Sequence, residues 1–307
     1  MQFDDKAGLD PSQVRDVRRG GGGFGGGGFG GGGRGAAVKG GGLLALVVAL
    51  LGAFFGVGPS NLGFNDATPD PGPRATDTAD LAGECRTGAD ANNKLDCRVV
   101  AITNSLQSYW SDEFQKRGGT YKDANTVIYS RAISTGCGNA TSAVGPFYCP
   151  ADMNVYLDLS FFNELQSRFG ARGGPFAQAY VIAHEYGHHV QNLTGVFARI
   201  GPNTGQGTAS NAVRLELQAD CYAGVWARNA MTTPDKTTGR PLITNLTEDD
   251  IRDGLDAAAA VGDDRIQEMA TGYVNPESWT HGSSAQRQQW FAQGLKTGDM
   301  NRCDTFR

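Results

Sequence analysis

The stretch Tyr180–Val190, which reads Y-V-I-A-H-E-Y-G-H-H-V, constrains this 307-residue chain more than any other. It contains the pattern H-E-x-x-H, in which His184 and His188 are four residues apart. Residues four apart lie on the same face of a helix, so both imidazoles can bind one metal ion, and Glu185 reaches the edge of the same site. Two neutral imidazoles beside a carboxylate are the groups that zinc-assisted hydrolysis uses. A chance match on a core helix is the alternative.

The sequence around this motif favours a helix whose histidines face inward. Pro175 suits the first turn, and Gly195 suits a position just beyond the last one. Between them a largely apolar stripe recurs at helical spacing and includes both histidines: Ala177, Val181, His184, His188 and Gln191. Imidazoles that face inward need partners, and we expect one Zn²⁺ ion to supply them.

A catalytic zinc ion usually has three protein ligands and one open position, so a third ligand is expected from another element. Residues 213–224 offer Glu216 and Asp220, again four apart on one helical face. We expect Glu216 to bind the ion and Asp220 to accept a hydrogen bond from the outer nitrogen of a ligating histidine. Two alternatives are a solvated acidic face paired with Arg214, and Cys221 as the ligand.

The remaining two histidines are expected to differ in role. His189 is turned about 100° from its neighbour His188 on the helix, so we expect it to pack or cap rather than bind metal. His281 lies at the start of the last expected helix, where its imidazole could donate to the oxyanion that forms when water adds to a carbonyl. A surface-loop histidine is the alternative. Arg287 and Tyr222 are weaker candidates for the same task.

The N-terminal region differs in composition from the rest. Residues 20–33 are all Gly except Phe24 and Phe29. Such a tract cannot bury enough apolar surface to offset its backbone entropy. We therefore predict that residues 1–42 form a disordered tail.

Leu43–Val57 is almost entirely apolar, and with its flanking glycines it approaches the ~20 residues of a membrane-spanning helix. A cleaved signal peptide is the alternative, but the preceding 42 residues are too long for an n-region and no A-x-A-like site follows. Arg34 and Lys39 precede the stretch, whereas aspartates predominate after it. The positive-inside rule then predicts a single-pass anchor with a cytoplasmic N-terminus and an exported domain. Residues 58–83, which contain four prolines, are expected to be a linker.

The cysteines agree with an exported domain. All six follow the apolar stretch, and an even number in an exported domain suggests disulfides. Fifteen pairings are possible for six cysteines, and the sequence alone does not choose among them. Proximity along the chain favours Cys85 with Cys97 and Cys137 with Cys149, which leaves Cys221 with Cys303.

Residues 84–307 are expected to form one folded, helix-rich α+β domain with a small sheet. Apolar periodicity and end signals predict helices at 97–116, 160–169, 175–194, 211–230, 247–261 and 283–293. Short β-branched and aromatic runs predict strands at 126–129 and 155–159. The net charge of −5 gives no reason to expect a nucleic-acid partner.

Four motifs resemble the neutral zinc metallopeptidase family of bacteria: H-E-Y-G-H-H at 184–189, E-L-Q-A-D-C-Y-A-G-V-W-A at 216–227, V-G-D-D-R-I-Q at 261–267 and T-H-G-S-S-A-Q-R at 280–287. The resemblance covers residues 84–307 and extends to a Gly-rich N-terminus with one anchor. More distantly, the order of motifs is similar to the membrane CAAX-protease and HtpX metallopeptidases. These likenesses imply a zincin-like fold in a bacterial cell membrane. They also imply that Glu216 is the third zinc ligand, that Asp220 supports the ligands and that His281 stabilises the transition state. Those distant relatives have several membrane helices, and this chain has one apolar stretch.

The sequence thus predicts a zinc-dependent peptidase at the membrane, with Glu185 as general base and a peptide or protein as substrate. One alternative is a non-catalytic binding module in which zinc holds two helices together. Structural zinc sites are usually closed by four protein ligands, and three strong ones are visible here, which favours catalysis. Another alternative is a zinc hydrolase of a non-protein amide such as a cell-wall peptide.

Overall fold

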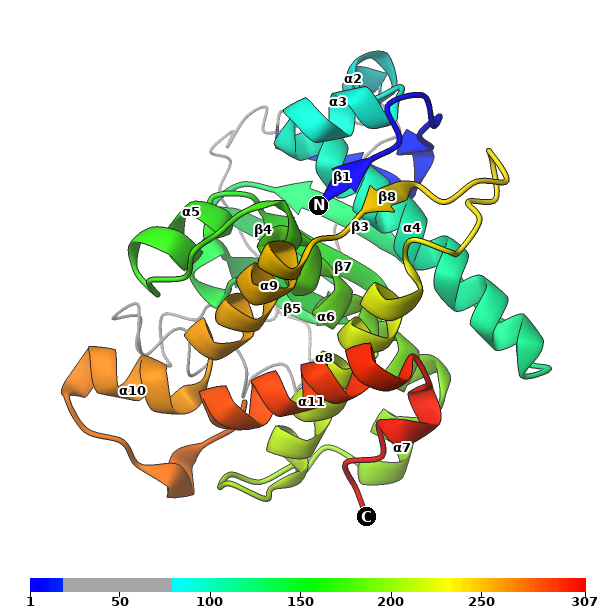
Figure 1. The fold of residues 1–307 in the computed structure, drawn as a ribbon. Helices are drawn as coiled ribbons and strands as arrows, with labels where there is room; N and C mark the ends of the chain where they lie inside the picture. Colours follow the sequence, from blue (N-terminus) through cyan, green and yellow to red (C-terminus); the bar gives the residue numbers. More distant parts are fainter. Residues whose placement is uncertain (19–78) are drawn as a thin grey trace, which may run out of the picture.

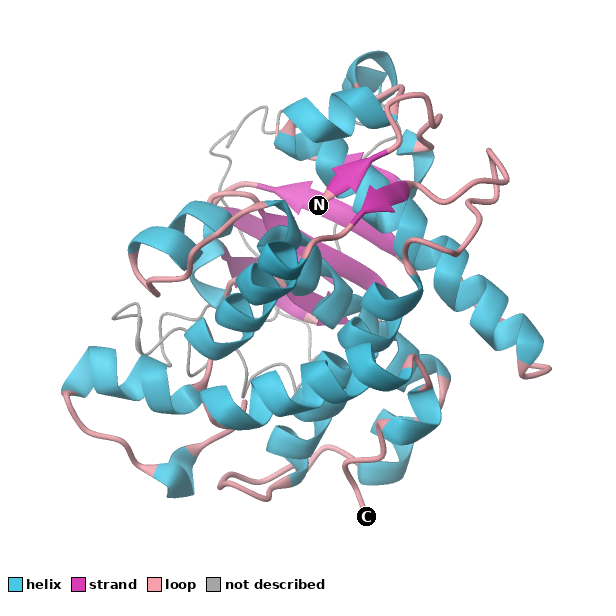
Figure 2. Ribbon diagram, viewed as in Figure 1, coloured by secondary structure: helices cyan, strands magenta, loops and turns pink. Residues whose placement is uncertain are grey.

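The computed structural model describes residues 1–18 and 79–307, which form a helix-rich α+β fold (Figures 1 and 2). Its main sheet has four strands in the order β2-β3-β7-β6. The strands β2 (Val14–Asp16), β3 (Asn125–Tyr129) and β7 (Asn154–Asp158) are parallel, and β6 (Phe147–Cys149) pairs antiparallel with β7. The strands predicted at 126–129 and 155–159 are confirmed, and Thr126 is the register partner of Val155.

Two small antiparallel pairs accompany this sheet. A hairpin joins β4 (Ala132–Thr135) to β5 (Gly138–Thr141), and β1 (Gln2–Phe3) pairs with β8 (Ile243–Asn245). The helices, in chain order, are α2 (Ala79–Glu84), α3 (Gly88–Asn93), α4 (Leu95–Lys116), α5 (Phe161–Ser167), α6 (Pro175–Leu193), α7 (Val196–Ile200), α8 (Asn211–Asn229), α9 (Glu248–Ala260), α10 (Asp263–Thr271) and α11 (Ser284–Thr297). All six predicted helices are confirmed, whereas the short helices α2, α3, α7 and α10 were not predicted.

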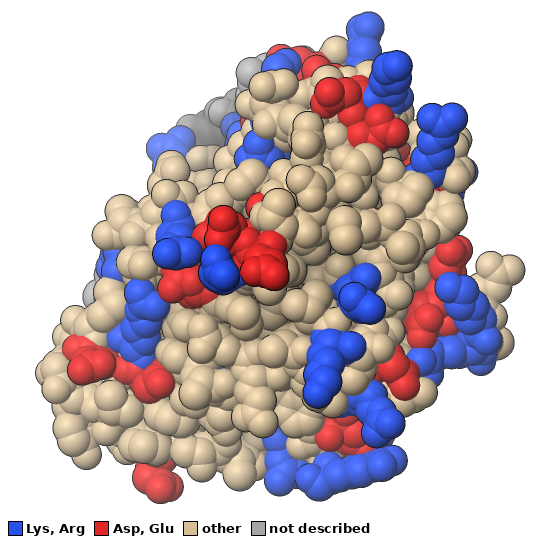
Figure 3. Space-filling model, in the orientation of Figure 1, with Lys and Arg blue, Asp and Glu red and all other residues tan. Residues whose placement is uncertain are grey.

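Helix ends follow local sequence signals. Pro175 occupies the first turn of α6, and Gly195, with φ of 74°, follows its last turn. Thr247 caps α9 through a capping box with Asp250, and acidic side chains fill the first turn of that helix, where carboxylates are favoured by the helix dipole. Figure 3 shows acidic side chains gathered over this part of the surface.

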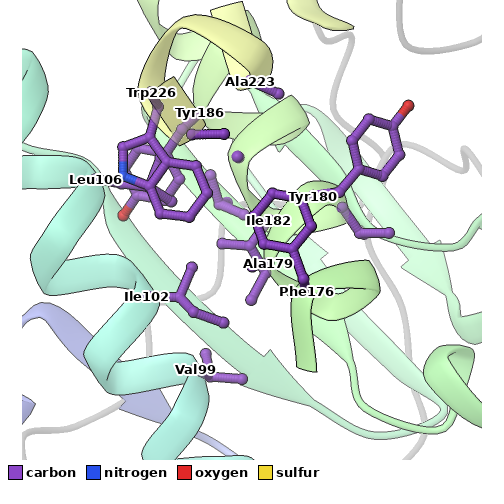
Figure 4. Packing of buried hydrophobic residues seen from close by; sticks show 14 of the residues in the cluster. Val99, Ile102, Leu106, Phe176, Ala179, Tyr180, Ile182, Tyr186, Ala223 and Trp226 are labelled. Atoms are coloured by element: carbon purple, nitrogen blue, oxygen red, sulfur yellow. The ribbon is translucent and has the colours of Figure 1, made fainter. Parts of the chain in front are cut away.

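Helix α6 is the centre of the hydrophobic core. It contacts α4, α8 and α9, and it rests on β6 and β7. Figure 4 shows Val99, Ile102 and Leu106 of α4 beside side chains of α6, with Ala223 and Trp226 of α8 completing the cluster. Helix α4 is buried on nearly all sides, so the chain must cover it from more than one direction.

Two contacts bring helices together more closely than a side chain would allow. A Cβ atom at Gly187 of α6 would lie 2.8 Å from the carbonyl oxygen of Ala219 on α8. On the other side of α8, a Cβ atom at Gly294 of α11 would lie 1.9 Å from the carbonyl oxygen of Cys221. Glycine is therefore required at both positions, and α8 is held between α6 and α11.

The three disulfides are Cys85–Cys97, Cys137–Cys149 and Cys221–Cys303, as proximity along the chain predicted. The first joins the residue after α2 to α4, and the second links the turn of the β4–β5 hairpin to β6. The third ties α8 to the C-terminal residues. The alternative in which Cys221 binds metal is wrong, because its sulfur is committed to a disulfide.

The prediction that residues 1–42 form a disordered tail is wrong for residues 1–18. These residues supply β1 and β2 and bury Phe3 and Val14 in the core. The sequence of this segment gave no signal, because its strands are only two and three residues long. The predicted linker at 58–83 is also too long, since α2 begins at Ala79.

The predicted anchor at 43–57 lies outside the described residues. In the two described ranges, none of the helices combines the length and apolar character needed to cross a bilayer. The pairing of β2 with β3 also conflicts with one part of the predicted topology. A single crossing at 43–57 would put residues 1–18 and the domain on opposite sides of the membrane, where they could not pair.

His189 is buried and joins α6 to β6 and to the chain that precedes β3. This confirms the prediction that it packs in the core. Its Nε2 donates to the carbonyl oxygen of Lys122 at 2.6 Å, and its Nδ1 lies 3.0 Å from the hydroxyl of Tyr148 on β6. Burial lowers the pKa of His189 to about 4, and the bond to Lys122 only partly opposes this. The folded protein therefore keeps this imidazole neutral.

This depressed pKa predicts a loss of stability in acid. Between pH 6.5 and 4 the unfolded chain binds a proton at His189 and the folded protein does not, so the free energy of unfolding should fall as pH falls, by about 3 kcal/mol from this group. His189→Gln should remove this part of the dependence. Urea unfolding of both proteins at pH 7, 5.5 and 4 measures the difference, and parallel pH profiles would contradict the assignment.

Candidate active site

Three side chains from two helices converge at one point. His184 and His188 come from α6 and Glu216 from α8, and their ligand atoms all lie within 4.8 Å of one another. Nε2 of His184 is 3.1 Å from one carboxylate oxygen of Glu216, and Nε2 of His188 is 3.4 Å from the other. Neighbouring ligands of a tetrahedral zinc ion are ~3.4 Å apart at ordinary bond lengths. The donor set and its spacing therefore fit a zinc ion.

The outer nitrogens of both imidazoles are held by other side chains. Nδ1 of His184 lies 2.8 Å from Asp220, and Nδ1 of His188 lies 2.8 Å from the amide oxygen of Gln191. Each acceptor favours a hydrogen on Nδ1, which leaves the Nε2 lone pair directed at the common point. These acceptors thus orient both imidazoles and favour the tautomer that binds metal.

Asp220 is fully buried and has three partners. Arg287 of α11 donates to both of its oxygens at 2.8 and 3.0 Å, and the hydroxyl of Tyr180 donates at 2.5 Å. Burial opposes the charge of Asp220, but Arg287 and His184 outweigh it and hold the pKa of this carboxyl below its usual value. A buried carboxylate with these partners stays ionised and can fix His184.

The electrostatic field at the convergence point favours a cation. Burial disfavours charge on His184, yet the carboxylates of Asp220 and Glu216 raise its pKa to about 10. Burial also opposes ionisation of Glu216, but the two histidines hold the pKa of Glu216 well below its usual value. A field that stabilises a proton on an imidazole also stabilises a divalent cation between imidazole and carboxylate.

Glu185 lies on α6 next to these groups and is buried. Burial raises the pKa of Glu185 above its usual value, and the charges of His184 and His188 partly oppose the shift. A carboxylate with a raised pKa is a better proton acceptor near neutral pH than an exposed one. Its position and basicity suit a general base.

His281 is buried and held by Asp263, which sequence reasoning did not single out. One oxygen of Asp263 accepts from the backbone N–H groups of residues 280, 281 and 282 at 2.6–2.9 Å. The other lies 3.1 Å from Nδ1 of His281. Burial lowers the pKa of His281, but Asp263 outweighs this and raises it, with a further contribution from Glu216. The alternative of a surface-loop histidine is therefore wrong.

The neighbouring carboxylate extends this arrangement to α11. Asp264 accepts hydrogen bonds from the backbone N–H and the hydroxyl of Ser284, each at 2.8 Å. The two aspartates of V-G-D-D-R thus hold the turn T-H-G-S-S in place at the start of α11. Both motifs were visible in the sequence, but nothing there indicated that one binds the other.

The weaker candidates divide clearly. Arg287 lies at the site, where it contacts Asp220. Tyr222 does not, because its ring packs edge-on against Trp110 in the core, with ring centroids 5.6 Å apart.

Glu216 and Asp220 are 4% and 0% exposed, so the alternative of a solvated acidic face is wrong. Tyr180 was missed, although it lies four residues before His184 on the same helical face.

Comparisons with known proteins agree with this geometry. A family model described as "Putative neutral zinc metallopeptidase" matches residues 3–306. The chain is 55% identical over 223 residues to the uncharacterized protein Rv2575 of Mycobacterium tuberculosis (73% of this chain and 74% of that protein). It is 39% identical over 270 residues to the uncharacterized protein YpfJ of Escherichia coli K12 (87% and 86%). No solved structure matches the chain. The family match spans nearly the whole sequence and includes every residue of the site, and the chain belongs to the neutral zinc metallopeptidase family.

Proposed function

We propose that this protein is a zinc-dependent peptidase that hydrolyses peptide bonds in peptides or proteins. The observation that carries the proposal is the convergence of His184, His188 and Glu216 beside a buried fourth group, Glu185. Family membership supports the zinc and the reaction class. A set of three protein ligands supports catalysis over a purely structural role, because a catalytic ion keeps one position open.

The chain's own residues supply the steps of the reaction. His184, His188 and Glu216 would hold one zinc ion, which lowers the pKa of a water molecule toward ~7 and polarises a carbonyl group. Glu185 accepts a proton from the attacking water and delivers it to the leaving amine. His281 donates a hydrogen bond to the oxyanion of the tetrahedral intermediate. Asp220 and Asp263 keep the imidazoles of His184 and His281 in the required orientation.

Membrane attachment is a separate part of the proposal. The apolar stretch Leu43–Val57 supports an association with the bacterial cell membrane. An attached enzyme would meet substrates at or near that membrane.

Glu185→Gln should abolish peptide hydrolysis and leave zinc bound, because the amide keeps the shape of the side chain but cannot accept the proton. Casein cleavage and zinc content by elemental analysis measure the two effects on the full chain. His184→Ala should instead lose zinc, and Glu164→Gln, at a partly exposed position of α5, should change neither. Retained turnover in Glu185→Gln would refute the role of general base.

The same assay separates the alternatives. Chelator-sensitive cleavage of casein supports a peptidase, and cleavage of cell-wall peptides alone would indicate a hydrolase of non-protein amides. Zinc binding without turnover of either substrate would indicate a binding module.

His281→Ala should lower kcat by about 10²–10³, since it removes one donor to the oxyanion. KM and zinc content should change little, because this imidazole is not among the three metal-binding side chains. Steady-state kinetics on a fluorogenic peptide measures kcat and KM separately. A change confined to KM would assign His281 to substrate binding instead.

Gly187→Ala should weaken zinc binding without unfolding the protein. The added methyl group would lie 2.8 and 2.9 Å from backbone atoms of Ala219, which have no flexible end that could yield. Helix α8 must then move and carry Glu216 away from the histidines. Competition with a zinc chelator measures affinity, and Gly83→Ala, with open space around it, is the control. Unchanged affinity would show that the close helix contact is not needed for the site.

A further inference from the structure

Residues 1–18, called here the N-terminal segment, are built into the domain by backbone hydrogen bonds. β2 extends the main sheet next to β3, and Val17 N–H continues the pairing to the carbonyl oxygen of Ile128 at 2.9 Å. Farther back, Gly88 N–H donates to the carbonyl oxygen of Ala7 at 2.9 Å, and Leu9 N–H to that of Arg86 at 3.0 Å. The segment therefore supplies an edge strand and a second backbone contact.

Two asparagines of the domain bind the segment in the same way. Asn92 accepts from Phe3 N–H at 2.9 Å and donates to Phe3 C=O at 3.0 Å. Asn104 of α4 makes the corresponding pair with Asp10 at 2.8 and 2.9 Å. Asn104 is only 1% exposed. Its place on a helix that is buried nearly all round makes sense only with the segment docked, because buried polar groups need partners.

The N-terminal segment also packs tightly against the surface on which it docks. A Cβ atom at Gly88 would lie 2.0 Å from the carbonyl oxygen of Asp4. Phe3 and Val14 are 2% and 0% exposed. This surface lies beside Cys85, which the disulfide to Cys97 fixes to α4. The segment thus fits closely against a region held by a disulfide.

We propose that the N-terminal segment docks on its own chain, on the same oxidising side of the membrane as the catalytic domain. Three disulfides and no free cysteine in the described residues indicate an oxidising compartment for the domain. Strand pairing and buried side chains then require the N-terminal segment to be in that compartment. The N-terminal segment and residues 79–307 therefore lie on the same side of the membrane, and the N-terminus is not cytoplasmic.

An engineered disulfide tests this directly. Gln2 and Asn245 are register partners in the antiparallel pair of β1 and β8, where Cα atoms are close enough for a disulfide. The full chain carrying Gln2→Cys and Asn245→Cys is produced in its bacterial host. Thiols are trapped by acid, and the unfolded protein is treated with a polyethylene-glycol maleimide. Each free thiol adds one label.

The proposal predicts no label on the double variant and a monomer on a non-reducing gel. After reduction the double variant should carry eight labels, because the six native cysteines also become free. Each single variant should carry one label. A control pair, Gln2→Cys with Glu268→Cys, should carry two, because α10 lies at the lower left of the molecule in Figure 1, well away from β1. Two labels on the Gln2–Asn245 pair would overturn the proposal. A disulfide-linked dimer would also overturn it, because the segment would then dock on a second copy.

A second measurement does not depend on added cysteines. Phe3→Ala should lower the midpoint of thermal unfolding of the purified full chain, whereas the exposed Gln2→Ala should not. Equal midpoints for both variants would show that the segment is not part of the fold. Neither experiment uses peptidase activity, so both stand independently of the proposed function.

Discussion

Everything at the site depends on how closely α8 approaches its two neighbours. Gly187 lets α6 and α8 meet backbone to backbone, which puts Glu216 within reach of both histidines. Gly294 does the same for α11, which carries Arg287 to Asp220. A layer of side chains in either contact would separate these groups by several ångströms, and buried charges would lose the partners that make their burial tolerable.

The parts of the site that lie on a single helix could be predicted from the sequence. The spacing of His184 and His188 fixes their common face, and Glu216 with Asp220 repeats that spacing on a second helix. Long periodic helices and the two buried strands were also predicted, as were all three cysteine pairs. Apart from Cys221–Cys303, which was the pair left over, the deciding information is local, because it lies within a few turns of helix or a short stretch of chain.

The features that were missed depend on contacts between distant segments. Asp263 holds His281 from a separate helix, and no periodicity links the two residues. Tyr222 was named as a weaker candidate because helical position alone does not show which face meets the core. The largest error was the prediction that the N-terminal segment is disordered. Its strands are too short to show an alternating apolar pattern, and their stability comes from the sheet that they join.

The Cys221–Cys303 bond encloses α9, α10 and α11 in one covalent loop. His281 and Arg287 both lie inside this loop. Cys221, where the loop begins, directly follows Asp220. A single backbone cut anywhere between residues 222 and 302 would therefore leave both fragments attached to each other. In the proposed peptidase, this linkage would limit the damage from accidental self-digestion, because a nicked molecule would retain all of the proposed catalytic residues.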